Sequence, residues 1–386
     1  MEAYLDNAAT TRVFPEVRKM MVHVMEEDFG NPSSKHTKGI TAENYIKEAK
    51  ETICTQLKCK PKEIIFTSGG TESNNMAFIG TAIANRRAGK HVITTRIEHA
   101  SVHEPMAYLE EMGYDVTYLP VDSTGRVSVE ELENAIREDT FLISIMYVNN
   151  EVGSVQPIEQ IGQMLKKKHP QILFHVDAIQ AFGKYKIVPK KLGVDMMSVS
   201  GHKIHGPKGS GFLYVNEKVE IRPILFGGGQ QDGMRSGTEN VPAIAGLGVA
   251  VKEIYTGHSE KRAKLYELKK RLIAGLQDVD GVTINALIDP IEETAPHIVS
   301  VSFANTRSEV MLHALAQKGV FVSSGSACSS NHPELSGTLQ AIGVKSELLD
   351  STLRFSFSVM TTSEEIDYAI EVVKEVLPVL RKFTRH

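Results

Sequence analysis

The chain has 386 residues, of which 41% are hydrophobic and 23% are charged, and its formal net charge is −4. This composition is typical of a soluble globular protein, and the length suggests two domains, or one large domain with an appendage, and allows a substantial buried core. The sequence carries no basic excess, so nucleic acid and anionic membranes are poor partners and we expect a small-molecule substrate.

Short apolar runs rich in β-branched residues alternate with longer helical patterns. In chain order we expect an amphipathic helical stretch at 43–57, strands at 63–67, 91–95 and 141–148 with helices from 72, 101 and 158, and further strands at 173–177 and 196–200. This alternation predicts an α/β fold with a mainly parallel central sheet flanked by helices.

The pattern changes in the last part of the chain. A long, amphipathic and charge-rich helical stretch is expected from about 241 to 276, followed by a strand at 298–303, a helix from 308 and a final helix from 364. We place the boundary to a smaller domain near residue 255.

The beginning of the sequence shows no charged segment followed by an apolar one, and no run approaches the roughly 18 apolar residues that a membrane helix needs. The cysteines, Cys54, Cys59 and Cys328, are too few for a disulfide framework. We therefore expect a cytoplasmic protein in a reducing compartment, with no membrane partner.

Ligands of open α/β sheets bind at the carboxyl ends of the strands, where this sequence places several polar clusters. The first, at 68–73, is a glycine turn before a helix, and it offers free N–H groups to a phosphate. Taken alone, a plain turn capped by Thr71 or Ser73 is the simpler interpretation. No Walker motif occurs, which argues against an ATPase.

Metal sites are not predicted. His99 and His103 stand one helical turn apart, but the sequence lacks the Glu of a zinc-protease motif between them and an obvious third ligand. We interpret His99 instead as a flat neighbour of a ring. Cys54 and Cys59 form a lone C-x4-C pair, and we interpret them as incidental thiols.

Three further features suggest chemistry. The segment 148–153 supplies amides and a carboxylate after a strand, although it could be a simple turn. Asp177 ends a nearly continuous apolar run, where a partly buried carboxylate needs a cationic or donor partner. Cys328 lies among small and polar residues, where packing does not explain a cysteine, and is a candidate nucleophile.

The sharpest cluster is a glycine-rich segment that places Lys203 a few residues beyond an apolar strand. A loop lysine is usually just solvated, and Lys208 is a local competitor. Ser200 and His202 could hydrogen-bond a phosphate while Lys203 reaches the aldehyde carbon of pyridoxal phosphate (PLP). A carboxylate such as Asp177 could keep the pyridine nitrogen protonated, so that the ring accepts electrons.

Short motifs are spread along practically the whole chain. They are Tyr-Leu-Asp-Asn-Ala-Ala-Thr-Thr at 4–11, Gly-Asn-Pro-Ser-Ser-Lys-His at 30–36, Gly-Gly-Thr-Glu-Ser at 69–73, Glu-His at 98–99, Asn-Asn-Glu at 149–151, His-Val-Asp at 175–177, Ser-Gly-His-Lys at 200–203, Arg-Ser-Gly-Thr-Glu-Asn at 235–240, Ser-Gly-Ser-Ala-Cys at 324–328 and Leu-Arg-Phe-Ser at 353–356. In this order the motifs resemble those of NifS/IscS-type cysteine desulfurases, which are class V aminotransferase-like PLP enzymes of fold type I.

The resemblance implies the PLP-dependent transferase fold of type I, with a mainly parallel central sheet flanked by helices and a small α+β domain. It places a large PLP-binding domain at 15–255. The small domain, formed by 1–14 with 256–386, would carry the loop with the catalytic cysteine.

The resemblance also implies a role for each matching residue. Lys203 would hold PLP covalently and act as the base, Asp177 would pair with the pyridine nitrogen, and Gln180 would donate to the phenolic oxygen. His99 would stack on the ring and is one candidate to deprotonate the catalytic cysteine, the substrate itself being the other. The full cofactor-binding set would be Gly70, Thr71, His99, Asn150, Asp177, Gln180, Ser200, His202, Lys203 and Thr238, the last reaching the phosphate from the second subunit of a homodimer.

For the substrate, the resemblance implies that Arg354 and Asn150 bind the carboxylate of L-cysteine, with Asn31 and His36 nearby. Cys328, as a thiolate, would take the sulfur as a persulfide and leave L-alanine. The sulfur would then pass to an acceptor such as an iron–sulfur scaffold protein or a thiolation enzyme.

The chain departs from the family pattern in two places. Gly337 stands where relatives have a histidine after the cysteine loop, and the segment 354–359 ends in Val rather than Arg. Two alternatives stay open. A selenocysteine lyase or another class V enzyme need not depend on a loop cysteine, whereas a PLP-bound regulatory or structural subunit would be expected to lose Lys203, Asp177 or Cys328, all of which are present.

Overall fold

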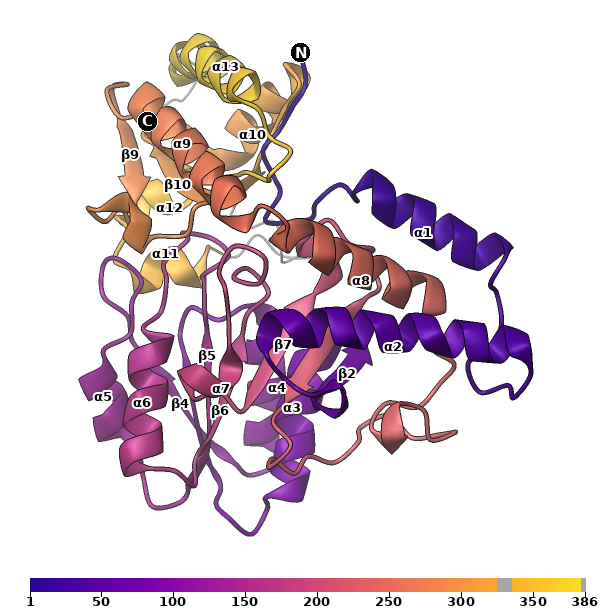
Figure 1. Cartoon of the computed structure of the whole chain (residues 1–386). Helices are drawn as coiled ribbons and strands as arrows, with labels where there is room; N and C mark the ends of the chain where they lie inside the picture. The colour runs from indigo at the N-terminus through magenta and orange to yellow at the C-terminus, as the bar shows by residue number, and fades with distance from the viewer. Residues whose placement is uncertain (325–334, 383–386) are drawn as a thin grey trace.

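The computed structural model describes residues 1–324 and 335–382 (Figure 1). The described chain forms a seven-stranded sheet, a four-stranded sheet and a separate pair of short parallel strands. Within these residues, no helix is long and apolar enough to cross a membrane.

The larger sheet has the strand order β2-β8-β7-β6-β5-β3-β4. Its strands are β2 (Ile64–Thr67), β3 (His91–Thr95), β4 (Asp115–Leu119), β5 (Thr140–Met146), β6 (Leu173–Asp177), β7 (Met196–Ser200) and β8 (Gly211–Val215). Neighbouring strands are parallel except at β8, which runs antiparallel to β2 and β7. The predicted mainly parallel sheet is confirmed. The sequence patterns missed β4, a half-exposed edge strand, and β8, which follows a glycine-rich run.

Helices cover both faces of this sheet (Figure 1). Ile64 and Phe66 of β2 belong to the core that includes residues of α2, α6 and α8, whereas Ile65 belongs to the core under α3 and α4, as the alternation of a strand requires. These helices are α1 (Pro15–Glu26), α2 (Thr37–Leu57), α3 (Gly70–Ala84), α4 (Ala100–Glu111), α5 (Val129–Ala135), α6 (Ile158–Lys168), α7 (Pro189–Leu192) and α8 (Val241–Tyr255), with the short 3-10 helices η1 (Pro61–Glu63), η2 (Gly201–Lys203) and η3 (Gln231–Gly233).

The second sheet is antiparallel, in the order β12-β13-β10-β9. Its strands are β9 (Val282–Asn285), β10 (Ile298–Phe303), β12 (Ser323–Ser324) and β13 (Thr352–Ser356), and β1 (Ala3–Tyr4) pairs separately with β11 (Val320–Phe321). The accompanying helices are α9 (His258–Leu276), α10 (Ser308–Gln317), α11 (Gly337–Ala341), α12 (Ser346–Leu349) and α13 (Ser363–Arg381), with η4 (Ile291–Glu293). The apolar core shared by α9, α10, α13, β10 and β13 also contains Ala3 and Leu5, whereas residues of α11 and α12 pack in a separate cluster with Val152.

The prediction of one helical stretch over 241–276 is wrong. The structure has two helices, α8 and α9, because the chain breaks at Thr256 and Gly257. Gly257 has φ 61°, a left-handed conformation that favours glycine. The two helices also differ in character, since α8 is mostly buried and apolar while α9 carries many charged residues.

The N-terminal segment connects the two sheets. In Figure 1 it descends from the part of the molecule that holds α10 and α13 towards α1. Leu5 donates its N–H to Phe321 at 2.8 Å, and farther along the segment Thr11 donates its N–H to His202 at 2.9 Å. The segment between Leu5 and Thr11 therefore lies beside the turn after β7.

Candidate active site

A pocket of about 440 Å³ lies at the carboxyl ends of β5, β6 and β7, where Met146, Asp177 and Ser200 line it. This is the edge at which open α/β sheets bind their ligands. The residues predicted from the sequence that line this pocket are Gly70, Thr71, His99, Asn150, Asp177, Gln180, Ser200, His202, Lys203 and Arg354.

Asp177 is the buried carboxylate of the pocket. It is 5% exposed, and its two oxygens accept hydrogen bonds from Asn74 Nδ2 at 2.9 Å and from the Ile179 N–H at 3.0 Å. Burial raises the pKa of Asp177, and the donor from Asn74 opposes that rise. The sequence predicted a buried Asp177 with a donor partner, but not that Asn74 is the donor.

Lys203 ends the 3-10 turn that follows β7. Its Nζ donates to the backbone oxygens of Ala8 and Ala9, both at 2.7 Å. Lys208, the competing candidate, is exposed and does not line the pocket. The N-terminal segment thus holds the amine of Lys203 at the pocket through backbone carbonyl groups, which have no signature in the side-chain pattern.

Two histidines of the pocket are held in the neutral form. His99 caps α4, and its Nδ1 accepts the N–H of Ser101 at 3.0 Å, so the ring proton of neutral His99 lies on Nε2. Burial lowers the pKa of His99. Burial, followed by the charge of Lys203, lowers the pKa of His202 to about 4.

The glycine turn before α3 forms one wall of the pocket. A Cβ atom on Gly70 would lie 2.1 Å from Cδ1 of Ile179, so the Ile179 side chain would have to move to admit one there. The N-cap of α3 is Gly69, without a side-chain cap, and Ser73 Oγ lies 2.8 Å from Thr67 Oγ1 instead. The cap by Thr71 or Ser73 is therefore absent in this part of the structure, which leaves N–H groups at the helix start for an anion.

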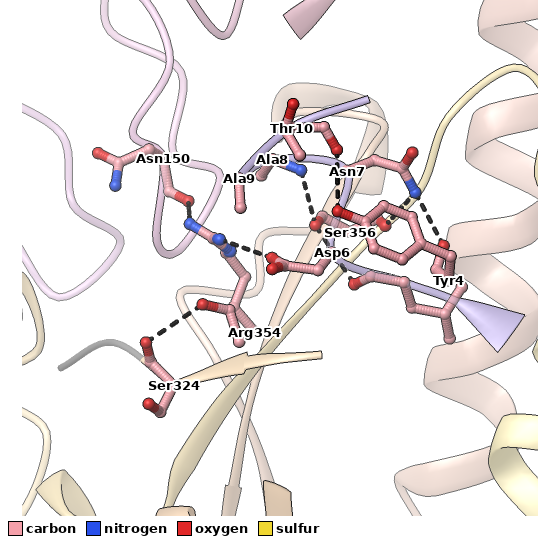
Figure 2. A network of polar contacts seen from close by, with 12 residues as sticks. Tyr4, Asp6, Asn7, Ala8, Ala9, Thr10, Asn150, Ser324, Arg354 and Ser356 are labelled. Atoms are coloured by element: carbon pink, nitrogen blue, oxygen red, sulfur yellow. Dashed lines mark hydrogen bonds and ion pairs between the residues drawn. The ribbon is translucent and has the colours of Figure 1, made fainter. Parts of the chain in front are cut away.

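Arg354 lies in the middle of β13 with its side chain 9% exposed. Its Nη1 donates to the backbone oxygen of Asn150 at 2.8 Å, and its Nη2 donates to Asp6 Oδ1 at 2.9 Å (Figure 2). Sequence reasoning missed Asp6, although the motif at 4–11 contains it. The signal in the sequence was the carboxylate of Asp6 inside that motif, for which no role was assigned.

Several predicted site residues lie elsewhere in the single chain. Asn31, His36 and Thr238 are exposed and do not line the pocket. Asn31 Oδ1 accepts the N–H of Ser33, and His36 caps α2 by accepting the N–H of Gly39. Their contacts with substrate or phosphate stay predictions.

Cys328 lies outside the described residues, but both flanks of its segment are placed. Ser324 pairs in register with Leu353, next to Arg354 in β13, and Ser323 lines the pocket. On the other side, Ser336 Oγ donates to Glu151 Oε2, one residue after Asn150. Both flanks are thus attached beside the pocket.

His103 and the Cys54–Cys59 pair, which were considered as metal ligands in the sequence, contact neighbouring side chains instead. The ring of His103 stacks on Tyr118, with centroids 5.8 Å apart. Cys54 and Cys59 contact each other, with their Sγ atoms 3.3 Å apart. Within 1–324 and 335–382, no group of three or more His, Cys, Asp or Glu is arranged to hold a metal ion.

The chain is similar to known proteins over nearly its full length. The family model of class-V aminotransferases matches residues 3–369. A protein named cysteine desulfurase IscS from Methanosarcina thermophila is 46% identical over 99% of this chain and 93% of its own length. A putative cysteine desulfurase, IscS 1, from Bacillus subtilis strain 168 is 43% identical over 97% of this chain and 98% of its own.

Solved structures agree with these relatives. A NifS-like protein superposes with a TM-score of 0.92 at 41% identity, covering 98% of this chain and 100% of that chain. A structure described as SspA in complex with cysteine superposes with a TM-score of 0.81 at 36% identity, over 93% of this chain and 100% of that chain.

Proposed function

The chain belongs to the class-V aminotransferase family and is a cysteine desulfurase, and we propose that it holds PLP on Lys203 and transfers the sulfur of L-cysteine to Cys328. The family assignment and the activity agree with the resemblance seen in the sequence. The observation that carries the proposal is the single pocket that gathers Lys203, Asp177, His99 and Arg354.

The residues of the pocket fit PLP. Asp177 is a buried carboxylate that would pair with the pyridine nitrogen, and the tight approach of Gly70 to Ile179 leaves a backbone cradle at a helix start for the phosphate. When bound, PLP would supply an electron-accepting ring that stabilises negative charge on the substrate Cα. Further holding groups would be Thr71, His99, Asn150, Gln180, Ser200, His202 and Lys203, with Thr238 from a second subunit.

Lys203 would move the proton of the reaction. Lys203 lines the pocket, and its Nζ would take the proton from the substrate Cα and return one later. The backbone oxygens of Ala8 and Ala9, each 2.7 Å from Nζ, hold the amine on this side of the pocket. Arg354, with Asn150, would bind the substrate carboxylate and orient L-cysteine, with Asn31 and His36 as the further predicted contacts.

Sulfur transfer would belong to Cys328. Its thiolate would attack the sulfur of the substrate, so that an S–S bond forms and the C–S bond breaks. The electron pair of the C–S bond would stay on the substrate Cβ, which takes up a proton and leaves as the methyl group of L-alanine. Burial lowers the pKa of His99, so its ring is neutral around pH 7 with the proton on Nε2. Because Nδ1 accepts the N–H of Ser101, His99 could take the thiol proton only by giving up that contact, and the substrate's own groups are the other candidate base. The persulfide would then pass to a sulfur-acceptor protein, such as an iron–sulfur scaffold or a thiolation enzyme.

We also propose a homodimer and the domain division at 15–255 against 1–14 with 256–386. Large apolar side chains are exposed around α1 and before η3, including Val22, Met25, Phe29 and Phe226, the last of them 81% exposed. Exposed apolar groups of this size are typical of protein interfaces. Arg235, three residues before Thr238, pairs with Glu72 in the first turn of α3 of the same chain at 2.8 Å, and the contact of Thr238 with the phosphate of a second subunit rests on the family resemblance.

The proposal is tested by sulfide and alanine release from L-cysteine in the presence of a reductant, with the visible absorbance of bound PLP recorded in parallel. Wild type is expected to release both products, and Cys328→Ala to bind PLP without releasing sulfide. The matched control is Cys54→Ala/Cys59→Ala, which removes two other thiols and is expected to stay active.

Other outcomes would overturn parts of the proposal. An equally active Cys328→Ala would favour a lyase or aminotransferase reaction, and release of selenide from selenocysteine without desulfuration of cysteine would favour a selenocysteine lyase. Binding of PLP without turnover of either amino acid by wild type would favour a regulatory subunit.

A further inference from the structure

Asp6 and Arg354 form an ion pair at the wall of the pocket, with Nη2 and Oδ1 2.9 Å apart. The Arg354 side chain is 9% exposed and that of Asp6 is 21% exposed. A guanidinium group at this depth needs a compensating carboxylate, because an unpaired buried charge is strongly destabilising. Asp6 supplies that carboxylate in the described part of the chain.

Two contacts fix the plane of the Arg354 guanidinium group. Nη2 donates to Asp6, and Nη1 donates to the backbone oxygen of Asn150 at 2.8 Å. Nε has no hydrogen-bond partner among the described residues. Because the guanidinium group is planar and rigid, holding both terminal nitrogens also sets the direction of the donors that remain for a ligand.

Asp6 itself is held by its backbone. Its carbonyl oxygen accepts the N–H of Ala9 at 3.1 Å, and Asp6 forms an isolated parallel bridge with Ser356 of β13. The same turn directs the oxygens of Ala8 and Ala9 to Lys203 Nζ. Figure 2 shows the side chain of Asp6 pointing to Arg354 while Asn7 points to the backbone around Tyr4 and Ser356.

We propose that Asp6 is a positioning residue for Arg354, whose guanidinium group it fixes in the orientation that receives the carboxylate of L-cysteine. The inference rests on the proposed function, in which Arg354 binds that carboxylate. Without Asp6, the guanidinium group keeps the contact with Asn150 but loses the contact that fixes Nη2, so it must be ordered when substrate binds. The free energy needed to order the guanidinium group weakens binding of the ground state and of the transition state equally. This raises KM and leaves kcat nearly unchanged.

The test compares Asp6→Ala and Asp6→Asn with wild-type holoenzyme. Asp6→Ala is expected to raise KM for L-cysteine about tenfold or more, the size expected for losing a hydrogen bond between charged groups, with kcat within about threefold of wild type. Asp6→Asn keeps an oxygen acceptor of similar size, so its rise in KM is expected to be smaller. If Asp6→Ala does not fold, Asp6→Asn against wild type decides the question.

Two further measurements separate positioning from a purely structural role. Binding of cysteamine, which lacks the carboxylate, is followed by the absorbance of bound PLP and is expected to change less than about twofold in both variants. In an Arg354→Gln background, Asp6→Asn is expected to add no further increase in KM, because the two residues act as one unit. The melting temperature of each variant without cofactor measures how much Asp6 contributes to the stability of the fold, separately from its effect on substrate binding.

The inference is overturned if KM is unchanged, if KM falls because Asp6 competes with substrate, or if cysteamine binding weakens as much as cysteine binding. It is also overturned if Asp6→Asn acts equally strongly in the Arg354→Gln background. All of these outcomes require a wild-type enzyme that releases sulfide from L-cysteine. If the proposed function is wrong, wild type itself releases no sulfide, so the two kinds of failure can be told apart.

Discussion

Lys184 and Lys203 are joined by a hydrogen bond of 2.8 Å from Nζ of Lys184 to the backbone oxygen of Lys203. Lys184 is 8% exposed, and burial, followed by the charge of Lys203, lowers the pKa of Lys184 to about 7. The charge of Lys203 opposes the charge of Lys184, so the two ammonium groups repel each other when both are protonated. The bond therefore joins a buried lysine to the backbone of the residue whose amine is proposed to move the proton.

The first prediction concerns this charge. In Lys184→Met, the pH at which the visible absorbance of bound PLP titrates is expected to move upward, because removing a neighbouring cation makes protonation at Lys203 easier. The matched control is Lys269→Met. Lys269 is also buried with its pKa lowered to about 7, but it donates to Thr294 and Ala295, away from the pocket. A shift of equal size in both variants would contradict the prediction.

The second prediction follows from the lowered pKa of Lys269 itself. Burial lowers this pKa from 10.5 to about 7, so between these values the unfolded chain binds a proton that the folded chain does not. The free energy of unfolding of wild type should therefore rise with pH from 7 towards 10.5 relative to Lys269→Met, which lacks the group. Denaturant unfolding of both proteins across this range measures the difference, and a constant or shrinking difference would contradict it.

Strong local patterns predicted much of the fold. β3, β6 and β7 have the bounds predicted, because each is a short, mainly buried run with an apolar or β-branched centre between helical segments. Gly257 shows where the approach fails: a single glycine inside a long helical pattern is tolerated in many helices, yet here its positive φ separates α8 from α9.

Some residues of the candidate site could likewise be predicted from the sequence, and others could not. Asp177 and Lys203 could be found from the sequence, because each is a polar side chain placed just after an apolar strand. Ala8 and Ala9 could not, since they act through carbonyl oxygens that every residue carries. The pairing of Asp6 with Arg354 joins residues 348 positions apart, and it depends on the tertiary fold rather than on any local pattern.

Gly70 carries the third prediction. A Cβ there would meet Ile179 Cδ1 at 2.1 Å, so Gly70→Ala is expected to displace the Ile179 side chain, which lines the pocket, and to weaken PLP binding by about tenfold or more, the size of a typical overpacking cost. Gly70→Ala/Ile179→Ala removes the clashing atom and should recover part of the affinity. Gly337→Ala is the control, because a Cβ on Gly337 has no neighbour within 4 Å in the described structure.

Cofactor binding is measured by titrating PLP into protein freed of cofactor and following the visible absorbance. Affinity of Gly70→Ala equal to that of wild type would contradict the prediction, because it would show that the displaced Ile179 side chain does not disturb the cofactor site. No recovery in the double variant would show that Ile179 is not the obstacle.

The last prediction concerns the charge of Asp177. In Asp177→Asn the side chain keeps its size but becomes neutral, so it no longer stabilises a protonated pyridine nitrogen, and kcat is expected to fall by about 100-fold or more. Asp195→Asn is a matched control, because Asp195 also accepts a backbone N–H, that of Phe174, but does not line the pocket. Asp195→Asn is expected to change the melting temperature more than the activity. An active Asp177→Asn variant would show that the ring does not depend on this carboxylate, whereas loss of PLP binding would assign Asp177 to affinity rather than to stabilisation of the charge on Cα.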